Sequence, residues 1–160
     1  MDTKLSHQIA KHLREVYFGG NWTSSNLKDN LADVTLQQAN TKLYNLNTIA
    51  ALVFHINYYV IAVTKVLQGA SLNASDKFSF DLPEINKERE WKILVAKTLE
   101  DAETFAKLIE QLSDDKLTEY FSDEKYGSYY RNLHGIIEHV HYHLGQIAII
   151  KKIIASSTHQ

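Results

Sequence analysis

Proline and glycine are scarce in this chain, which has one proline, Pro83, and six glycines among 160 residues. Because these two residue types most often interrupt regular structure, their scarcity predicts long helices joined by short connections. Apolar residues recur at helical spacing in four stretches of the sequence. These stretches predict helices over about residues 3–17, 48–68, 87–112 and 128–155.

Short elements are predicted between the long helices. Thr35 opens a capping-box pattern, which predicts a short helix ending near Tyr44. Asn47 is the expected N-cap of the long helix that follows. Residues 70–85 form a polar segment that is long enough to be a crossover or the rim of a pocket. Residues 118–127 are aromatic and polar, which fits a short hairpin or an extended connection.

The composition indicates one all-α domain covering residues 1–160. Hydrophobic residues make up 44% of the chain, which is enough for a sizeable core at this length. No repeat, low-complexity tract or linker divides the sequence. The pattern therefore predicts four long helices in one bundle, with a few short helices added.

Charge and cysteine content argue against several classes of function. The net charge is -2 with the signs interspersed, so no surface for nucleic acid is expected. Cysteine is absent, which excludes disulfides and cysteine-ligated metals and fits a cytoplasmic location. The longest apolar stretch, residues 49–67, contains polar residues such as His55 and Asn57, so a buried helix is favoured over a membrane span. The segment after Met1 lacks the features of a signal peptide.

Three histidines carry the strongest functional signal. His139 and His143 are four residues apart, so a helix places both imidazoles on one face. On a helical wheel they lie roughly 60° to 100° to one side of the centre of the buried stripe. His55 lies opposite the polar sector of its own helix, a sector that contains Asn57. We therefore expect His55 to point into the bundle rather than to water.

A metal site made of His55, His139 and His143 is the favoured interpretation. A buried imidazole needs partners for both nitrogens, and a metal ion can take one while an oxygen takes the other. Three neutral imidazoles suit Zn²⁺, Ni²⁺, Fe²⁺ or Co²⁺ and leave a position open for water or substrate. The alternative for His55 is a core histidine bonded to a tyrosine or a backbone carbonyl. A structural metal is disfavoured because structural zinc usually has four protein ligands.

Other metal and nucleotide motifs fail on detail. The run that starts at His139 has Val140 where the zincin motif needs a catalytic glutamate. Glu138 and His141 form one E-x-x-H motif, whereas a di-iron bundle needs a second. His141 and His134 are expected on the other side of the helix, exposed or at a contact. No Walker loop, GxGxxG or GxSxG motif is present.

Four further residues are candidates for the surroundings of the metal. Tyr58 and Tyr59 flank the inward histidine of their helix and could supply hydroxyl donors. Glu138 directly precedes the histidine pair. Gln146 lies one turn beyond the pair and either orients a ligand or sits on the surface. No obvious general base stands out, so the catalytic residues stay unassigned.

Residues 139–147 read HVHYHLGQI and resemble the signature of the DinB/YfiT-like superfamily of metalloenzymes. In that family the last helix carries a pattern close to N-H-x-x-Y-H-R-G-Q-I, and a further histidine comes from the second helix. Residues 49–56, which read IAALVFHI, are similar to that second context. The resemblance covers nearly the whole chain.

The resemblance implies an up-down-down-up four-helix bundle with a long crossover, a metal triad of His55, His139 and His143, and homodimers. Characterised relatives include mycothiol-dependent isomerases and bacillithiol transferases, in which the metal binds a low-molecular-weight thiolate that attacks an electrophile. Leu144 and Glu138 stand where the family often has arginine and asparagine, so no specific substrate is carried over.

The sequence therefore predicts a divalent-metal-binding protein that acts on a small molecule as a metal-dependent transferase or hydrolase, with a low-molecular-weight thiol as a candidate cofactor. The alternative is a non-catalytic bundle that binds a small ligand, or a dimeric stress protein with a vestigial site. An open cavity beside the three histidines would favour the enzyme, and a filled cavity would favour the alternative. Gly145, which costs the helix about 1 kcal/mol relative to alanine, fits either close packing or a tolerated surface position.

Overall fold

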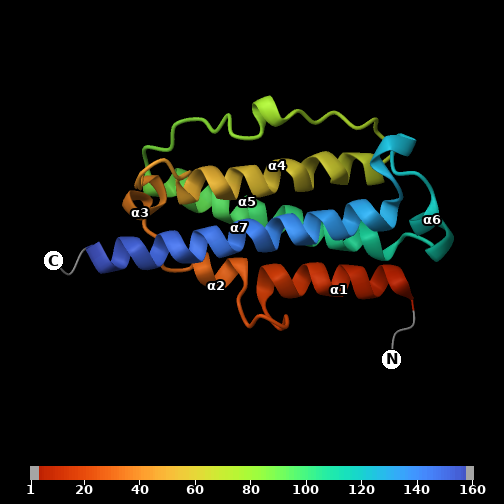
Figure 1. Ribbon diagram of the computed structural model, residues 1–160, viewed down its shortest axis with the longest axis horizontal. Coiled ribbons are helices and arrows are strands. Elements are labelled where there is room, and N and C mark those ends of the chain that lie inside the picture. Colours follow the sequence, from red (N-terminus) through yellow and green to blue (C-terminus); the bar gives the residue numbers. More distant parts are fainter. Residues whose placement is uncertain (1–3, 158–160) are drawn as a thin grey trace.

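The computed structural model describes residues 4–157, and this part of the chain is mostly helical (Figure 1). Its only β structure is an isolated antiparallel bridge between Tyr120 and Ser128, which joins residue 120 of the segment predicted as a hairpin or extended connection (118–127) to the residue just after that segment. Four long helices lie side by side: α1 (Leu5–Phe18), α4 (Ile49–Leu67), α5 (Glu88–Glu110) and α7 (Tyr129–Ser157). The all-α prediction is confirmed, and each long helix begins and ends within about two residues of its predicted position.

Short helices occupy the connections between the long ones. They are α2 (Leu27–Leu31), α3 (Leu36–Asn40) and α6 (Asp114–Thr118), with 3₁₀ turns at Asp76–Phe78 and Glu124–Tyr126. The capping box at Thr35 is present, but α3 ends at Asn40 and not near Tyr44, because Thr41 is already extended. The N-cap of α4 is Thr48 and not Asn47, since the Thr48 hydroxyl accepts the backbone N–H of Ala51 at 3.1 Å.

The end of α4 turns the chain sharply through Gly69, which has a φ of 92°. The N–H of Ala70 donates to the carbonyl of Lys65, and the N–H of Gly69 donates to that of Val66, both at 2.9 Å. This pair of bonds is the Schellman motif, which favours glycine at the left-handed position. The connection that follows, residues 68–87, returns along the length of α4 (Figure 1).

The core lies between the four long helices. α4 and α1 each pack against both α5 and α7. The largest side chains with almost no exposure include Trp91, Tyr17, Phe105, Leu13 and Leu133. Burying a large apolar side chain of this kind contributes roughly 1.5 to 3 kcal/mol.

Most of helix α4 is buried inside the molecule. It is long and apolar enough to cross a membrane by length and composition, yet 61% of it is buried inside the molecule, as in the core helix of many proteins. One residue of its polar sector, Asn57, does not face water, because it is 5% exposed and donates to Asp101 of α5 at 2.8 Å, whereas Lys65 and Gln68 of the same sector are exposed. The carboxylate of Asp101, which also accepts from Lys97 at 2.8 Å, makes this burial tolerable.

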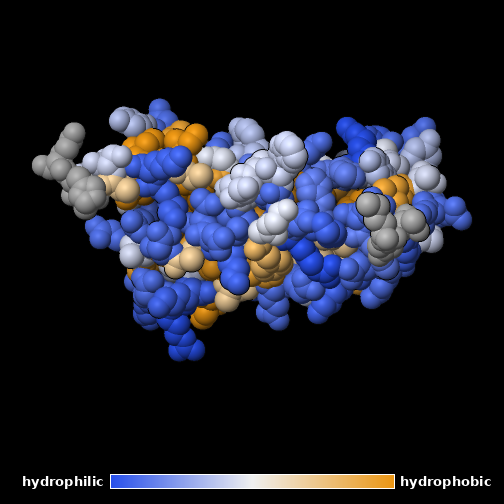
Figure 2. Space-filling view, turned by 90° about the horizontal axis from the view of Figure 1, so that it is seen from below, coloured by the Kyte–Doolittle hydropathy of each residue, from blue (hydrophilic) through white to orange (hydrophobic). Residues whose placement is uncertain are grey.

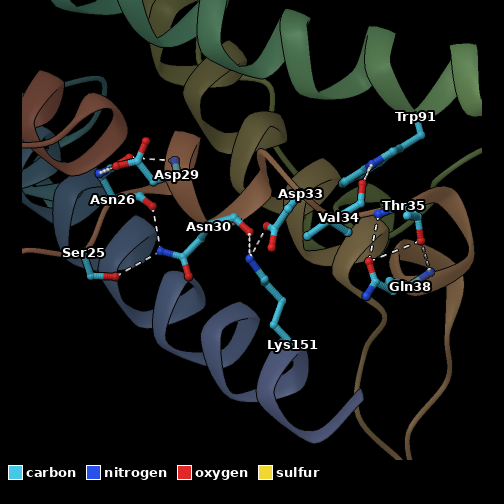
Figure 3. A network of polar contacts seen from close by, with 10 residues as sticks. All are labelled: Ser25, Asn26, Asp29, Asn30, Asp33, Val34, Thr35, Gln38, Trp91 and Lys151. Atoms are coloured by element: carbon cyan, nitrogen blue, oxygen red, sulfur yellow. Dashed lines mark hydrogen bonds and ion pairs between the residues drawn. The ribbon is translucent and has the colours of Figure 1, made fainter. Parts of the chain in front are cut away.

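Ion pairs and polar contacts fasten the shorter segments to the long helices. Lys151 of α7 donates to the carbonyl of Asn30 at 2.8 Å and pairs with Asp33 at 2.5 Å (Figure 3). The indole N–H of Trp91 donates to the carbonyl of Val34 at 2.7 Å. The α2–α3 segment is therefore tied to both α7 and α5.

The face of the molecule that carries α1 and α2 is mainly hydrophilic, with small separate hydrophobic areas (Figure 2). Arg14 of α1 donates to both carboxylate oxygens of Glu103, at 2.9 and 3.0 Å, and also pairs with Glu110. The guanidinium of Arg14 lowers the pKa of Glu110. Charged side chains thus bridge α1 and α5 above the apolar contact between these helices.

Candidate metal centre

Three histidines that are far apart in the sequence converge between α4 and α7. The Nε2 atoms of His139 and His55 lie 3.0 Å apart, and those of His143 and His139 lie 3.1 Å apart. One nitrogen from each of the three rings lies within 4.8 Å of the others. Residues 4–157 contain no other group of three or more histidine, aspartate or glutamate side chains arranged in this way.

The spacing of these nitrogens suits a shared metal ion. Bonds of about 2.1 Å to one ion, at angles between 90° and 109°, would put neighbouring ligand nitrogens about 3.0 to 3.4 Å apart. Both measured separations fall in that interval. His55 and His143 are 8% and 7% exposed, so solvent does not compete freely for their nitrogens.

Oxygen acceptors fix the orientation of two of the rings. The Nδ1 atom of His55 lies 3.3 Å from the carbonyl oxygen of Ser79, and Nδ1 of His143 lies 2.7 Å from Oε1 of Gln146. Because carbonyl and amide oxygens can only accept, each Nδ1 carries the proton in the neutral ring. The Nε2 lone pairs of both histidines consequently point at the common centre, because the hydrogen bond at Nδ1 fixes which nitrogen of the ring is left for a metal.

Hydrogen bonding within the triad does not satisfy all three rings. Nε2 of His139 faces two nitrogens, yet a single nitrogen has either one hydrogen or one lone pair to offer. Nδ1 of His139 is buried and has no hydrogen-bond partner among the described residues. A cation at the centre would use all three Nε2 lone pairs at once, so these residues fit a metal better than they fit one another.

The environment keeps the three imidazoles neutral. Burial, followed by the nearby rings of His143 and His55, lowers the pKa of His139 to about 4. Burial also lowers the pKa of His55 and that of His143. Neutral imidazole is the form that binds metal. Because these pKa values are lowered, protons compete little with a metal ion for the three nitrogens near neutral pH.

Aromatic rings enclose the histidines on the α4 side. Phe80 stacks on His55 with ring centroids 3.9 Å apart and an interplanar angle of 9°. Tyr59 meets His55 and His139 edge-on, at 5.2 and 5.0 Å. The Tyr59 hydroxyl donates to the Asp76 carboxylate, and burial raises its pKa.

A pocket of about 1050 Å³ opens beside the triad. Its wall is formed by α4, α7, the 68–87 connection and the segment before α7. Besides the three histidines, it is lined by Tyr59, Ala62, Val63, Leu72, Ala74, Asp76, Ser79, Phe80, Phe121, Tyr126, Arg131, Asn132, Gly135, Ile136, Glu138 and Tyr142. The 70–85 segment therefore does form a pocket rim, one of the two roles predicted for it.

The other predicted site residues fall into different places. Gln146 contacts His143, and Tyr59 and Glu138 line the pocket. Tyr58 does not line it, because its hydroxyl is bonded to the backbone of Ser75. A Cβ atom built on Gly145 would meet nothing within 4 Å, so close packing does not explain that glycine and it is a tolerated exposed residue.

Sequence reasoning missed Ser79, Asp76 and Phe80, which come from the 68–87 connection and its 3₁₀ turn and not from one of the long helices. The polar character of that segment was the available signal, but its register against His55 depends on where the chain turns back. His134 and His141 lie at a contact, as expected, because both rings face His12 of α1 with centroids 6.5 and 6.2 Å apart.

The described chain is thus a helical protein with three histidines that could hold a metal ion. No protein-family model matches the sequence, and comparison with curated proteins and with solved structures gives no significant match. What the site can do is therefore argued from its own residues.

Proposed function

We propose that this protein binds one divalent metal ion through His55, His139 and His143 and uses it to transfer or hydrolyse a group on a small molecule. The observation that carries the proposal is the convergence of three Nε2 atoms, two of them with their Nδ1 protons held by oxygen acceptors, at the wall of a pocket of about 1050 Å³. Three protein ligands leave part of the coordination sphere open, which is typical of catalytic rather than structural sites.

A bound ion would supply Lewis acidity to an oxygen or sulfur atom that enters the pocket. The chain's own residues would orient the histidine ligands and move protons. Ser79 and Gln146 hold the rings of His55 and His143 in position. Phe80 stacks on the His55 ring and covers one face of it. The Tyr59 hydroxyl donates to the Asp76 carboxylate, and both line the pocket, where they would move a proton to or from a ligand.

The proposal includes membership of the DinB/YfiT-like superfamily and the up-down-down-up bundle of that family. Its support is the HVHYHLGQI segment, the histidine supplied by α4, and the long return of residues 68–87 between α4 and α5 (Figure 1). A low-molecular-weight thiol as cofactor, a homodimeric state and a cytoplasmic location belong to the same proposal. The thiol and the homodimer rest on the resemblance alone, and the location rests on the absence of cysteine.

Cobalt substitution tests the proposed open site. Co²⁺ bound by three imidazoles with few other ligands gives strong visible absorption, and a small thiol such as 2-mercaptoethanol would add a sulfur-to-cobalt charge-transfer band. We expect both signals in the wild type and neither in His139→Ala. Weak octahedral absorption that a thiol leaves unchanged would contradict an accessible coordination position.

The alternative is a protein that binds a small ligand without chemistry, for which the size of the pocket is the supporting observation. A substitution that removes the contact between Tyr59 and Asp76 distinguishes the two proposed functions. Under the catalytic proposal, Tyr59→Phe lowers turnover of a substrate found by screening while leaving its binding unchanged. A ligand-binding protein would show no turnover in either form.

A further inference from the structure

The pocket beside the histidines has two chemically different ends. At one end lie the three histidines with Asp76 and Glu138. At the other lies Arg131, whose Nη1 donates to the carbonyl of Tyr126 at 3.0 Å. Arg131 precedes His139 by eight residues on α7, which places the two Cα atoms about 12 Å apart along the helix axis.

Arg131 has no carboxylate partner among the described residues, although it is the one arginine or lysine in the pocket lining. It is held in place by packing instead. Gly127 has a φ of 74°, and a Cβ atom built there would come within 3.0 Å of Cδ of Arg131. The glycine lets the aliphatic part of Arg131 lie against the backbone while its remaining guanidinium N–H groups stay available for an anion.

The wall between the two ends is mostly apolar. Ala62 and Val63 contribute to it from α4, and Gly135 and Ile136 from α7. A Cβ atom on Gly135 would meet nothing within 4 Å, so this glycine faces open space in the middle of the pocket. The pocket therefore presents a metal-binding end, an apolar middle and a cationic end.

We infer that the pocket takes an elongated small molecule with an apolar middle and a terminal carboxylate, which Arg131 binds while the other end of the molecule reaches the histidine triad. The inference rests on the proposed function, because it assumes a metal at the triad. The charges agree with this polarity: Asp76 and Glu138 offset the charge of a divalent ion at the histidine end, so the guanidinium of Arg131 is the uncompensated positive charge that attracts a carboxylate at the far end.

Hydroxamates of defined length test the inference by binding, without requiring a known reaction. The monohydroxamate of suberic acid has a metal-chelating group at one end and a carboxylate at the other, whereas octanohydroxamate lacks the carboxylate. Binding of both to zinc-loaded protein is measured by calorimetry. We expect the suberic compound to bind roughly tenfold more tightly, as a charge-assisted pair with arginine would give.

Variants assign that difference to residues. In Arg131→Gln the preference for the suberic compound disappears, and in Arg131→Lys it is reduced, because lysine keeps the charge but loses the planar fork. Lys125→Gln is the matched control, since it removes a positive charge from the 3₁₀ turn just before α7 but not from the pocket lining. Gly135→Leu fills the middle of the pocket, so it weakens both long hydroxamates and leaves acetohydroxamate binding unchanged.

The outcomes separate the inference from the function on which it rests. Equal affinity of the wild type for the two long hydroxamates, or a preference that survives Arg131→Gln, would overturn the role of Arg131 while the metal site stands. Failure to load zinc, together with no binding of acetohydroxamate, would remove the metal site and the inference with it. Unchanged acetohydroxamate affinity in Arg131→Gln excludes misfolding as the cause of a lost preference.

Discussion

Nε2 of His139 lies 3.0 Å from Nε2 of His55, although the two residues are 84 positions apart in the sequence. Packing of α4 against α7 produces this approach and also brings Nε2 of His143 to 3.1 Å from Nε2 of His139, so one hydrogen on His139 cannot satisfy both neighbouring nitrogens. An arrangement that is poor as a hydrogen-bond network is well suited to a cation. The contacts around the triad then determine how firmly an ion would be held.

Removing the Gln146 contact is predicted to weaken metal binding without removing a ligand. Gln146→Leu leaves Nδ1 of His143 without its acceptor, and lost contacts of this kind typically cost 10- to 100-fold in metal affinity. Competition with a chromophoric chelator measures the effect for zinc. Gln146→Glu retains an oxygen acceptor and should keep the wild-type affinity, so equal losses in both variants would contradict a positioning role for Gln146.

The metal-free protein is predicted to lose stability on mild acidification. The pKa of His139 is about 4 in the folded protein, below the 6.5 of an unperturbed histidine, so the unfolded chain binds more protons between these values. The stability that neutral His139 contributes is therefore complete above about pH 6.5 and is lost as the pH falls toward 4. Allowing for solvent screening, we expect the free energy of unfolding, measured by urea titration, to fall by about 1 to 2 kcal/mol over this pH interval.

The same experiment on His139→Leu identifies the source of this pH dependence. The substitution removes the titrating group, so the variant should lose less stability than the wild type over the same interval. Parallel curves for the two proteins would assign the pH dependence to other groups, such as the carboxylates of α5.

Arg14→Gln is predicted to lower the free energy of unfolding by about 1 kcal/mol, the upper range for partly exposed ion pairs. The arginine bridges Glu103 and Glu110 and fastens α1 to α5. Added salt should narrow the difference between variant and wild type in urea titrations. Arg89→Gln is the control, since Arg89 is exposed and has no ion pair among the described residues; an equal effect there would show that only net charge matters.

Two glycines are predicted to respond oppositely to alanine. Gly145→Ala should raise the unfolding free energy by about 0.5 to 1 kcal/mol, because the site is helical, exposed and unobstructed. Gly69→Ala should lower it by about 1 kcal/mol, because its φ of 92° is unfavourable for a residue with a side chain. Chemical denaturation checks both, and a stabilised Gly69→Ala would show that the turn after α4 relaxes freely.

Helical periodicity was sufficient to predict the four long helices and the convergence of His55 with His139 and His143. Periodicity describes which residues share a face, and this determines which side chains can meet when helices pack. It does not describe what the opposite helix offers. Asn57 illustrates the difference: it is polar because Asp101 of α5 lies against it, although Lys65 and Gln68 of the same sector do face water.

The parts of the site that sequence reasoning missed lie in irregular structure. Ser79, which accepts from His55, and Phe80, which stacks on the same ring, come from a segment with no repeating pattern. Their positions depend on the Gly69 turn and on the contacts of Asp76 with Tyr59. Arg131 was missed for a similar reason, since its place in the pocket depends on the close approach to Gly127.

The most direct test of the account is the metal content of untagged protein purified without chelator, measured beside His55→Ala, His143→Ala and the control His141→Ala. The account predicts about one equivalent of zinc, nickel or iron per chain in the wild type and in His141→Ala, and loss of the metal in the other two variants. Wild-type protein that contains no metal, and takes up none when these ions are offered, would contradict the three-histidine site.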